Sequence, residues 1–140
     1  MGIEENKELA RRFVENANKD GSSVLDEITT DNFVMHNMHS GTDLDREAMK
    51  KSNINIHIPF PNQSLTLDDI VAEGDKVSVR TTFRGTQDGK FRDIDPTGKN
   101  VSVARFIIFR LENGKLAEGW FLGDSLGTFQ QLGVDLPKPQ

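Results

Sequence analysis

The second half of the chain contains two pairs of alternating apolar segments, each pair interrupted by a short turn sequence. In "QSLTLDDIVAEGDKVSVRTTFRGTQ" the interruption is "EGDK", and in "KNVSVARFIIFRLENGKLAEGWFL" it is Asn113-Gly114. Asn-Gly between two alternating runs is the strongest short signal for a two-residue hairpin, because both turn residues must adopt positive φ. The pattern therefore predicts four antiparallel strands in this half, and the rest of the chain must fold around them.

The first half is predicted to be mainly helical. "NKELARRFVENANKDG" places Leu9, Phe13 and Ala17 four residues apart, which predicts an amphipathic helix that ends near Gly21. "SSVLDEI" predicts a short second helix and "NFVMHNM" a short strand. "SGTDLDREAMKK" predicts a third helix behind an acidic cap, and "SLGTFQQLG" a closing helix. Helices followed by an antiparallel meander indicate an α+β fold with the helices on one sheet face.

Such a sheet has a consequence for binding. A long twisted sheet that is covered on one face curls, and a cavity then forms between its concave face and the helices. We expect a small ligand to bind there.

The stretch "SNINIHIPFPN" allows two interpretations. Ile54, Ile56 and Ile58 alternate with polar residues, which favours a strand. The preceding charged helix could instead continue into this stretch and end at Pro59.

Composition removes several classes of function. The 140 residues fit one domain, 1–140, and 17 Lys and Arg against 22 Asp and Glu give a formal net charge of −5. An acidic chain without a basic run argues against nucleic acid or membrane partners, and the cytoplasm is the default location. Cysteine is absent, and the sequence has no phosphate loop or dinucleotide fingerprint, so we expect no cofactor. His36 and His39 face opposite sides of a strand, so we expect no metal site.

Asp124 is the main catalytic candidate because it stands among apolar residues in "EGWFLGDSLGTFQQLG". Two interpretations are open. It immediately precedes the predicted closing helix and could simply cap it, which its spacing favours. Alternatively its apolar neighbours would favour the protonated form, so that it could exchange a proton near neutral pH as a general base.

Parity along the strands supplies the other candidates. His36 shares a face with Val34 and Met38 and points inward if they do, either as a core histidine or as a general acid. Gln87 shares the inward face of its strand with Thr81 and Phe83. Trp120 has the parity of Leu122 and Asp124 and would lie along the same wall as the acid.

The opposite face of the sheet predicts self-association. It would carry charged and polar residues together with two bulky apolar ones: Ser78, Arg80, Thr82, Arg84, Phe106 and Ile108. Because apolar residues on an uncovered face would be left in water, we expect a homodimer formed through this face.

The motif series "FRGTQDGKF…DPTGKNVSV…FIIFRLENGKLAEGW…D…LGTFQQLGV" resembles the SnoaL-like polyketide cyclase (ester cyclase) family of the nuclear transport factor two-like superfamily. The resemblance implies a cone-shaped α+β barrel of the cystatin-like type, with a curved antiparallel sheet and a deep apolar cavity. It also implies cofactor-free aldol closure of a polyketide ester, a lyase- or isomerase-type reaction, with Asp124 as acid/base and His36 as its partner. Substrate contacts would come from Gln87, Trp120, Phe83, Thr81 and Phe60, and "SNINIHIPFPN" would be the end of a helix.

Two positions depart from the family pattern. Gln87 stands where the family commonly has histidine, and glutamine cannot carry a proton at neutral pH. Gly123 stands where the residue before the acid is often aromatic. These departures keep a second possibility open, a non-catalytic module that binds a small hydrophobic or aromatic ligand.

Overall fold

The computed structural model describes residues 2–19 and 23–135, and Gly21, where the first helix was expected to end, lies outside them. The helices are α1 (Ile3–Ala17), α2 (Leu25–Ile28), α3 (Arg46–Asn55) and α4 (Ser125–Gln131). The strands are β1 (Thr29–Asn37), β2 (Thr42–Asp45), β3 (Ser64–Glu73), β4 (Lys76–Thr86), β5 (Asn100–Glu112) and β6 (Lys115–Gly123). The four predicted helices and the four strands of the second half are all present, whereas the short β2 was not predicted.

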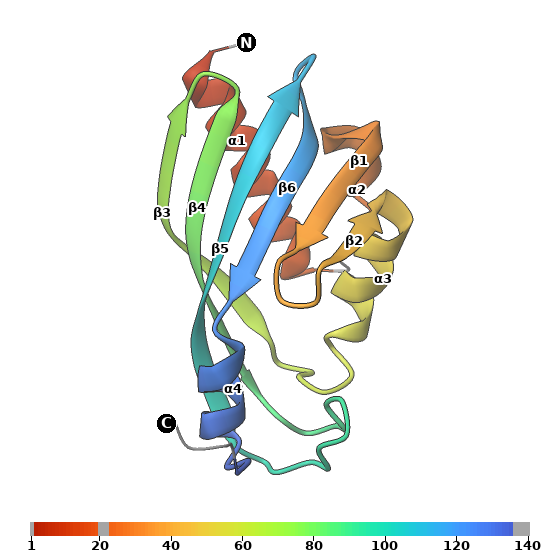
Figure 1. The fold of residues 1–140 in the computed structure, drawn as a ribbon, viewed down its shortest axis with the longest axis vertical. Helices are drawn as coiled ribbons and strands as arrows, with labels where there is room; N and C mark the ends of the chain where they lie inside the picture. The colour runs from red at the N-terminus through yellow and green to blue at the C-terminus, as the bar shows by residue number, and fades with distance from the viewer. Residues whose placement is uncertain (1, 20–22, 136–140) are drawn as a thin grey trace.

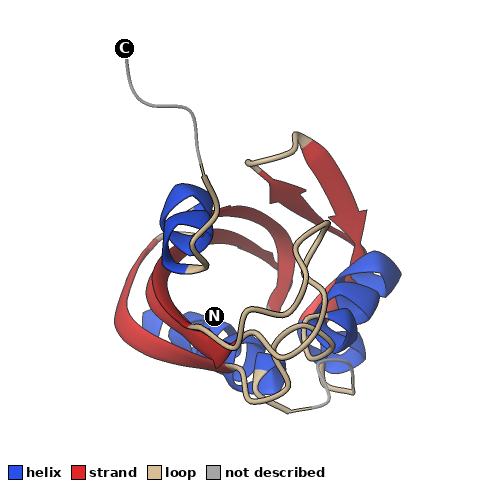
Figure 2. Cartoon of the chain, turned by 90° about the horizontal axis from the view of Figure 1, so that it is seen from below, coloured by secondary structure: helices blue, strands red, loops and turns tan. Residues whose placement is uncertain are grey.

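The described strands form one sheet in the order β2-β1-β6-β5-β4-β3, which curls without closing (Figures 1 and 2). The hairpin predicted at Asn113-Gly114 is confirmed, and its two residues have φ of 51° and 76°, as a type I′ turn requires. The expectation of a purely antiparallel sheet is wrong at one place, because β1 pairs with β6 in parallel. These two strands are not joined by a hairpin, so no turn dictates their relative direction.

Helix α1 lies diagonally behind the strands in Figure 1 and packs on β3, β4 and β6. Helix α3 packs beside β1 and β2, and α4 follows β6 and contacts β5. The α+β class and the curved, cone-like sheet that the sequence predicts are therefore confirmed. The helices cover the concave face of the sheet, and the interior of the protein lies between this face and the helices.

The helical interpretation of "SNINIHIPFPN" is the correct one. Asp45 caps helix α3, since its side chain accepts the backbone N–H of Ala48 at 2.8 Å, and the helix ends at Asn55 before a turn. Ile54 and Ile58 are exposed, whereas Ile56 packs against the core. The alternation of the three isoleucines therefore does not reflect a strand.

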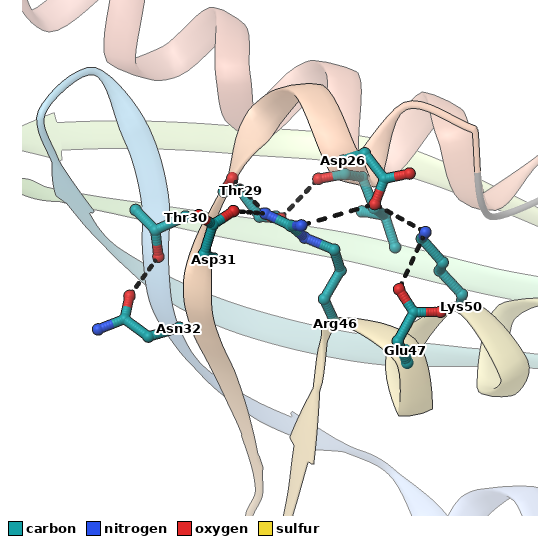
Figure 3. A network of polar contacts seen from close by, with 9 residues as sticks. Asp26, Thr29, Thr30, Asp31, Asn32, Arg46, Glu47 and Lys50 are labelled. Carbon is teal, nitrogen blue, oxygen red and sulfur yellow. Dashed lines mark hydrogen bonds and ion pairs between the residues drawn. The ribbon is translucent and has the colours of Figure 1, made fainter.

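Helix α3 is held in place by a polar network centred on Arg46 (Figure 3). Its guanidinium donates from Nε to the hydroxyl of Thr29 at 2.8 Å and from Nη2 to the Thr29 carbonyl at 2.9 Å. Lys50, one turn along, pairs with Asp26 at 2.7 Å and with Glu47 at 3.2 Å. The network ties α3 to the α2–β1 junction, and this contact sets the position of one wall of the interior.

The buried side chains form two clusters. One contains Ala10, Phe13, Leu25, Ile28, Phe33, Met35, Val77, Val79, Ile107, Phe109, Leu111 and Leu116. The other contains Val14, Phe60, Leu65, Phe83, Val101, Val103 and Leu132. Phe13 and Phe109 meet edge to face in the first, with ring centroids 4.9 Å apart, and Phe60 and Phe83 do so in the second, at 5.3 Å. The interior thus contains two packed clusters of side chains. A ligand can bind only in the space that they leave open.

Candidate ligand-binding site

A cavity of about 240 Å³ lies on the concave face of the sheet. Both clusters contribute to its lining: Phe13, Met35 and Ile107 come from one, and Phe60, Leu65, Phe83 and Val103 from the other. Helix α3 supplies Met49, Ser52 and Asn53. The volume suits a ligand of one or two rings, and the aromatic lining favours an apolar one.

Three of the residues predicted to contact a ligand, Phe60, Phe83 and Thr81, line the cavity. The two phenylalanine rings are almost fully buried and stand edge to face. The Thr81 hydroxyl donates to the carbonyl of Arg105 at 2.9 Å, so its polar group is already satisfied and its methyl group remains for packing. The floor of the cavity is therefore apolar.

Asp124 lies at the mouth of the cavity and caps α4. Its Oδ1 accepts the backbone N–H of Gly127 at 2.8 Å. The cap interpretation is thus confirmed. The expected dry surroundings are not found: Asp124 is exposed, and its neighbours Leu122 and Leu126 are exposed as well. The cap fixes the carboxylate at the rim of the cavity, with one oxygen occupied by the helix.

The structure places His36 outside the cavity, on the opposite, convex face of the sheet. The expectation that it points inward with Val34 and Met38 is wrong, because the inward residues of β1 are Phe33 and Met35, and Met38 is exposed. The ring is held between two carboxylates. Nδ1 lies 2.7 Å from Asp43 Oδ1 and Nε2 lies 2.6 Å from Glu118 Oε2.

The hydrogen bonds to Glu118 and to Asp43 raise the pKa of His36. Glu118 also accepts from Arg110 Nε at 3.0 Å, and the hydrogen bond from His36, followed by the one from Arg110, lowers the pKa of Glu118. His36 is therefore part of an ion network on the convex face. It cannot reach a ligand in the cavity.

Trp120 also lies on the convex face, where its ring is stacked at a tilt on His36 with centroids 5.6 Å apart. The expectation that it lines the wall beside Asp124 is wrong, since Phe121 and Gly123 face the cavity instead. The prediction failed because Asp124 follows the last residue of β6 and belongs to the cap of α4. The alternation of the strand therefore does not extend to Asp124.

Gln87 points inward and is completely buried, but it does not line the cavity. Its Nε2 donates to the carbonyls of Gly89, Ile94 and Asp95 at 3.1–3.2 Å. Its Oε1 accepts from the hydroxyl and the backbone N–H of Thr97 at 2.7 and 3.2 Å. The amide is thus fully used in shaping the loop between β4 and β5, and no group is left for a substrate.

The sequence analysis did not assign several polar residues of the lining to the site, among them Asn37, His39 and Arg105. Asn37 and Arg105 share odd numbering with Met35 and Ile107, so the inward parity of β1 and β5 was the signal that could have identified them. Asn37 Oδ1 accepts the His39 backbone N–H at 3.0 Å, an orientation that leaves its N–H₂ group for a ligand.

His39 joins the β1–β2 turn to the end of β6. Its Nε2 accepts the backbone N–H of Gly123 at 2.8 Å, so the neutral ring carries its proton on Nδ1, 3.2 Å from the Ser125 hydroxyl. Burial, followed by the charges of Arg92 and Arg105, lowers the pKa of His39. Because Nδ1–H is a donor, His39 cannot take the Ser125 proton, and this pair does not form an activated nucleophile.

Arg105 is the charged residue that lies within the cavity. Its guanidinium carbon lies 4.0 Å from the centre of the Phe83 ring and 5.6 Å from that of Phe121. Burial lowers its pKa to about 10, so it remains charged at neutral pH. Of the carboxylates that the structure describes, none pairs with it.

A curled α+β sheet with helices over an aromatic cavity defines the fold of the nuclear transport factor two-like class. The profile of the SnoaL-like polyketide cyclases matches residues 7–132, and the chain belongs to this family. No protein with a curated description matches it.

Solved structures agree with this assignment. TsrD from Streptomyces laurentii is 30% identical with a TM-score of 0.84, the match covering 96% of this chain and 99% of that one. IdmH from Streptomyces antibioticus, described as a candidate polyketide cyclase, is 27% identical with a TM-score of 0.83, covering 92% and 99%. A SnoaL-like candidate cyclase from Jannaschia sp. CCS1 is 25% identical with a TM-score of 0.85, covering 96% and 95%.

Within the described part of the chain, no helix is long and apolar enough to cross a membrane.

Proposed function

We propose that the protein is a cofactor-free cyclase that closes a ring in a small carbonyl compound by intramolecular aldol reaction, with Asp124 as acid and base. One observation carries the proposal: the helix cap holds the Asp124 carboxylate at the rim of an aromatic cavity. Membership of the cyclase family and the likeness to the candidate cyclase IdmH support it.

The proposed reaction is balanced without any added reagent. Asp124 removes a proton from the carbon beside one carbonyl of the substrate, and the resulting enolate carbon attacks a second carbonyl, forming a carbon–carbon bond. The alkoxide that results takes the proton back from Asp124. The free amide N–H₂ of Asn37, in the cavity lining, would donate to the enolate oxygen while it carries charge. This assigns to Asn37 the role that His36 and Gln87 cannot fill from their positions.

The test is turnover of a polyketide-type substrate by Asp124→Asn. Asparagine keeps the shape and the ability to cap, but it cannot accept a proton. We expect the turnover rate to fall at least about a hundredfold, which lies within the usual contribution of a general base. Asp43→Asn, on the convex face, serves as the control and should keep the wild-type rate. Wild-type turnover by Asp124→Asn would remove the acid/base assignment.

A non-catalytic binding module is the second candidate, and the placement of Gln87 and His36 favours it. Both lie outside the cavity lining, so Asp124 has fewer catalytic partners than the family resemblance implies. In this case the cavity would bind an aromatic ligand without consuming it. Recovery of the unchanged ligand after incubation, with the same affinity in Asp124→Asn, would favour the module over the cyclase.

We also propose that the protein is a homodimer through the convex face. Phe106 and Ile108 of β5 pair in register with Leu122 and Trp120 of β6, and so form one contiguous apolar patch. Phe106, Ile108 and Leu122 are 45–54% exposed, and exposed apolar patches of this kind mark association sites. Arg84, at the side of the patch, donates to the Thr66 hydroxyl at 3.2 Å, and its charge is the one that an acidic residue of a second copy would meet.

Light scattering at micromolar concentration tests the dimer. We expect about twice the 15.7 kDa mass of the chain, and the chain mass itself for Ile108→Asp, because an aspartate would be buried at the interface without a partner. Leu126→Asp is the control, because Leu126 is also exposed but lies on α4. A wild-type mass of one chain would contradict the proposal.

A further inference from the structure

The cavity contains a positive charge that the protein does not neutralise. The guanidinium of Arg105 lies over Phe83 and near Phe121, and part of the side chain stays accessible from the cavity. Among the described residues that line the cavity, Asp124 is the only acid, and no ion pair joins it to Arg105. A cation removed from water without a partner costs free energy. The unpaired charge of Arg105 therefore destabilises the protein in the absence of a ligand. A bound anion would offset this cost and would explain why the arginine is there.

The chain makes room for this arginine at Gly123. A Cβ atom there would come within 3.1 Å of Arg105 Cγ, closer than most Cβ contacts, and would make an ordinary contact with His39 Nε2 at 3.5 Å. A side chain larger than a methyl group at this position would compete with Arg105 for the same space. The departure at Gly123 and the arginine within the cavity are thus parts of one arrangement.

A second cation stands at the mouth. Arg92 lies over the rings of Phe91 and Phe129, at 5.5 and 5.6 Å, and also lines the cavity. Its φ of 53° is in the left-handed region, which is uncommon for a residue other than glycine and is found disproportionately at functional sites. His39 accepts the Gly123 N–H in its neutral form, and burial, followed by the charges of Arg92 and Arg105, lowers its pKa. Two positive charges, one at the mouth and one within, favour the entry of an anion.

We propose that the cavity binds an organic carboxylate, whose charged group pairs with Arg105 while its apolar body packs on Phe60 and Phe83. This inference rests on the proposed ligand cavity and deepens it by naming the chemical class of the substrate. The guanidinium offers two parallel N–H donors that match the two oxygens of a carboxylate. The substrate would then be a free acid, in place of the ester that the family resemblance implies.

The test compares two probes of almost the same shape, 2-naphthoate and methyl 2-naphthoate, by isothermal titration calorimetry. We expect the wild type to bind the acid roughly tenfold or more tightly than the ester, as the loss of a charged hydrogen bond predicts. Arg105→Met keeps the length and packing of the side chain without its charge, and it should bind both probes equally weakly. Gly123→Ala should weaken binding of the acid by displacing Arg105.

Arg84→Met is the matched control. It removes one arginine from the exposed face of the sheet, where Arg84 donates to Thr66 at 3.2 Å, and it should keep the wild-type preference for the acid. Thermal melting of the apo forms separates binding from folding, since Arg105→Met should melt at the wild-type temperature or above it. A structural arginine would instead give a clear loss of stability.

The possible outcomes distinguish the two proposals. Equal binding of acid and ester by the wild type would overturn the inference and leave the apolar cavity standing, with Arg105 serving only an oxyanion formed during reaction. A preference for the acid that persists in Arg105→Met would also overturn it. Failure of both probes to bind would count against the cavity itself, and therefore against the proposed function as well.

Discussion

Arg105 and Arg110 lie five residues apart on β5 but on opposite faces of the sheet, and their surroundings differ completely. Arg110, on the convex face, pairs with Glu112 at 3.1 Å and Glu118 at 3.0 Å, and these hydrogen bonds raise its pKa. Arg105, on the concave face, has two aromatic rings for neighbours, and burial lowers its pKa to about 10. Arg110 is thus paired within the chain, whereas none of the described carboxylates pairs with Arg105.

The two histidines repeat this contrast. His36 on the convex face lies between two carboxylates, which raise its pKa, whereas His39 at the cavity accepts a backbone N–H and has its pKa lowered. In this fold the type of a side chain alone therefore does not indicate its role. The face of the sheet on which the residue stands decides it.

The largest effect is expected from the phenylalanines of β5. Phe109 is fully buried against Phe13, whereas Phe106 is 49% exposed on the convex face. Phe109→Ala should lower the free energy of unfolding by about 3–5 kcal/mol, and Phe106→Ala by less than about 1 kcal/mol. Urea denaturation at submicromolar concentration measures both. Equal losses would show that the two faces do not differ in packing.

Gln87 differs from Arg105, because it is a polar residue on the concave side whose side-chain amide is fully hydrogen-bonded within the chain. Gln87→Ala removes five hydrogen bonds to the β4–β5 loop and should cost about 2 kcal/mol or more. Gln87→His, which introduces the residue common in the family, should recover only part of this loss, because one ring cannot make all five bonds. Urea denaturation of both variants provides the measurement, and a wild-type midpoint for Gln87→Ala would contradict the assigned role.

The two arginines should respond to substitution in opposite directions. Arg110→Met breaks two ion pairs on the exposed face and should cost up to about 1 kcal/mol. Arg105→Met removes an unpaired charge and should leave stability unchanged or raise it. Differential scanning calorimetry in low salt gives both values. A larger loss for Arg105→Met than for Arg110→Met would reverse the comparison.

The histidines give the smallest effect, with opposite signs. The raised pKa of His36 means that its contribution to stability is complete below the unfolded value of 6.5 and is lost as the pH rises through its folded value. The lowered pKa of His39 means that its contribution is present above 6.5 and is lost as the pH falls through its folded value. NMR titration, assigned with His36→Gln and His39→Gln, should place the two midpoints on either side of 6.5. Midpoints in the reverse order would contradict the structure.

The elements of the fold could be predicted because local signals specify them. Asn113-Gly114 requires a hairpin, and Asp45 caps a helix whichever fold surrounds it. The parallel pairing of β1 with β6 could not be predicted, because no turn connects these strands.

The site was harder to predict because strand parity tells which residues share a face and not which face is concave. In β1 both parities contain apolar residues, so His36 was assigned to the wrong side. The apolar neighbours of Asp124 suggested a dry environment, but Leu122 and Leu126 are themselves exposed. Arg105 was missed because a lone arginine in a strand carries no motif, and its shared parity with Ile107 was the only signal in the sequence that it faces the cavity.

The central claim, that the concave face is the binding face, can be tested with the methionine methyl groups. Met35 and Met49 line the cavity, and Met38 is exposed outside it. NMR of protein labelled with ¹³C at the methionine methyl groups, titrated with 2-naphthoate, should shift Met35 and Met49 and leave Met38 unchanged. Shifts at Met38 alone, or no shift at Met35 and Met49 while the probe binds, would place the ligand elsewhere and contradict the account.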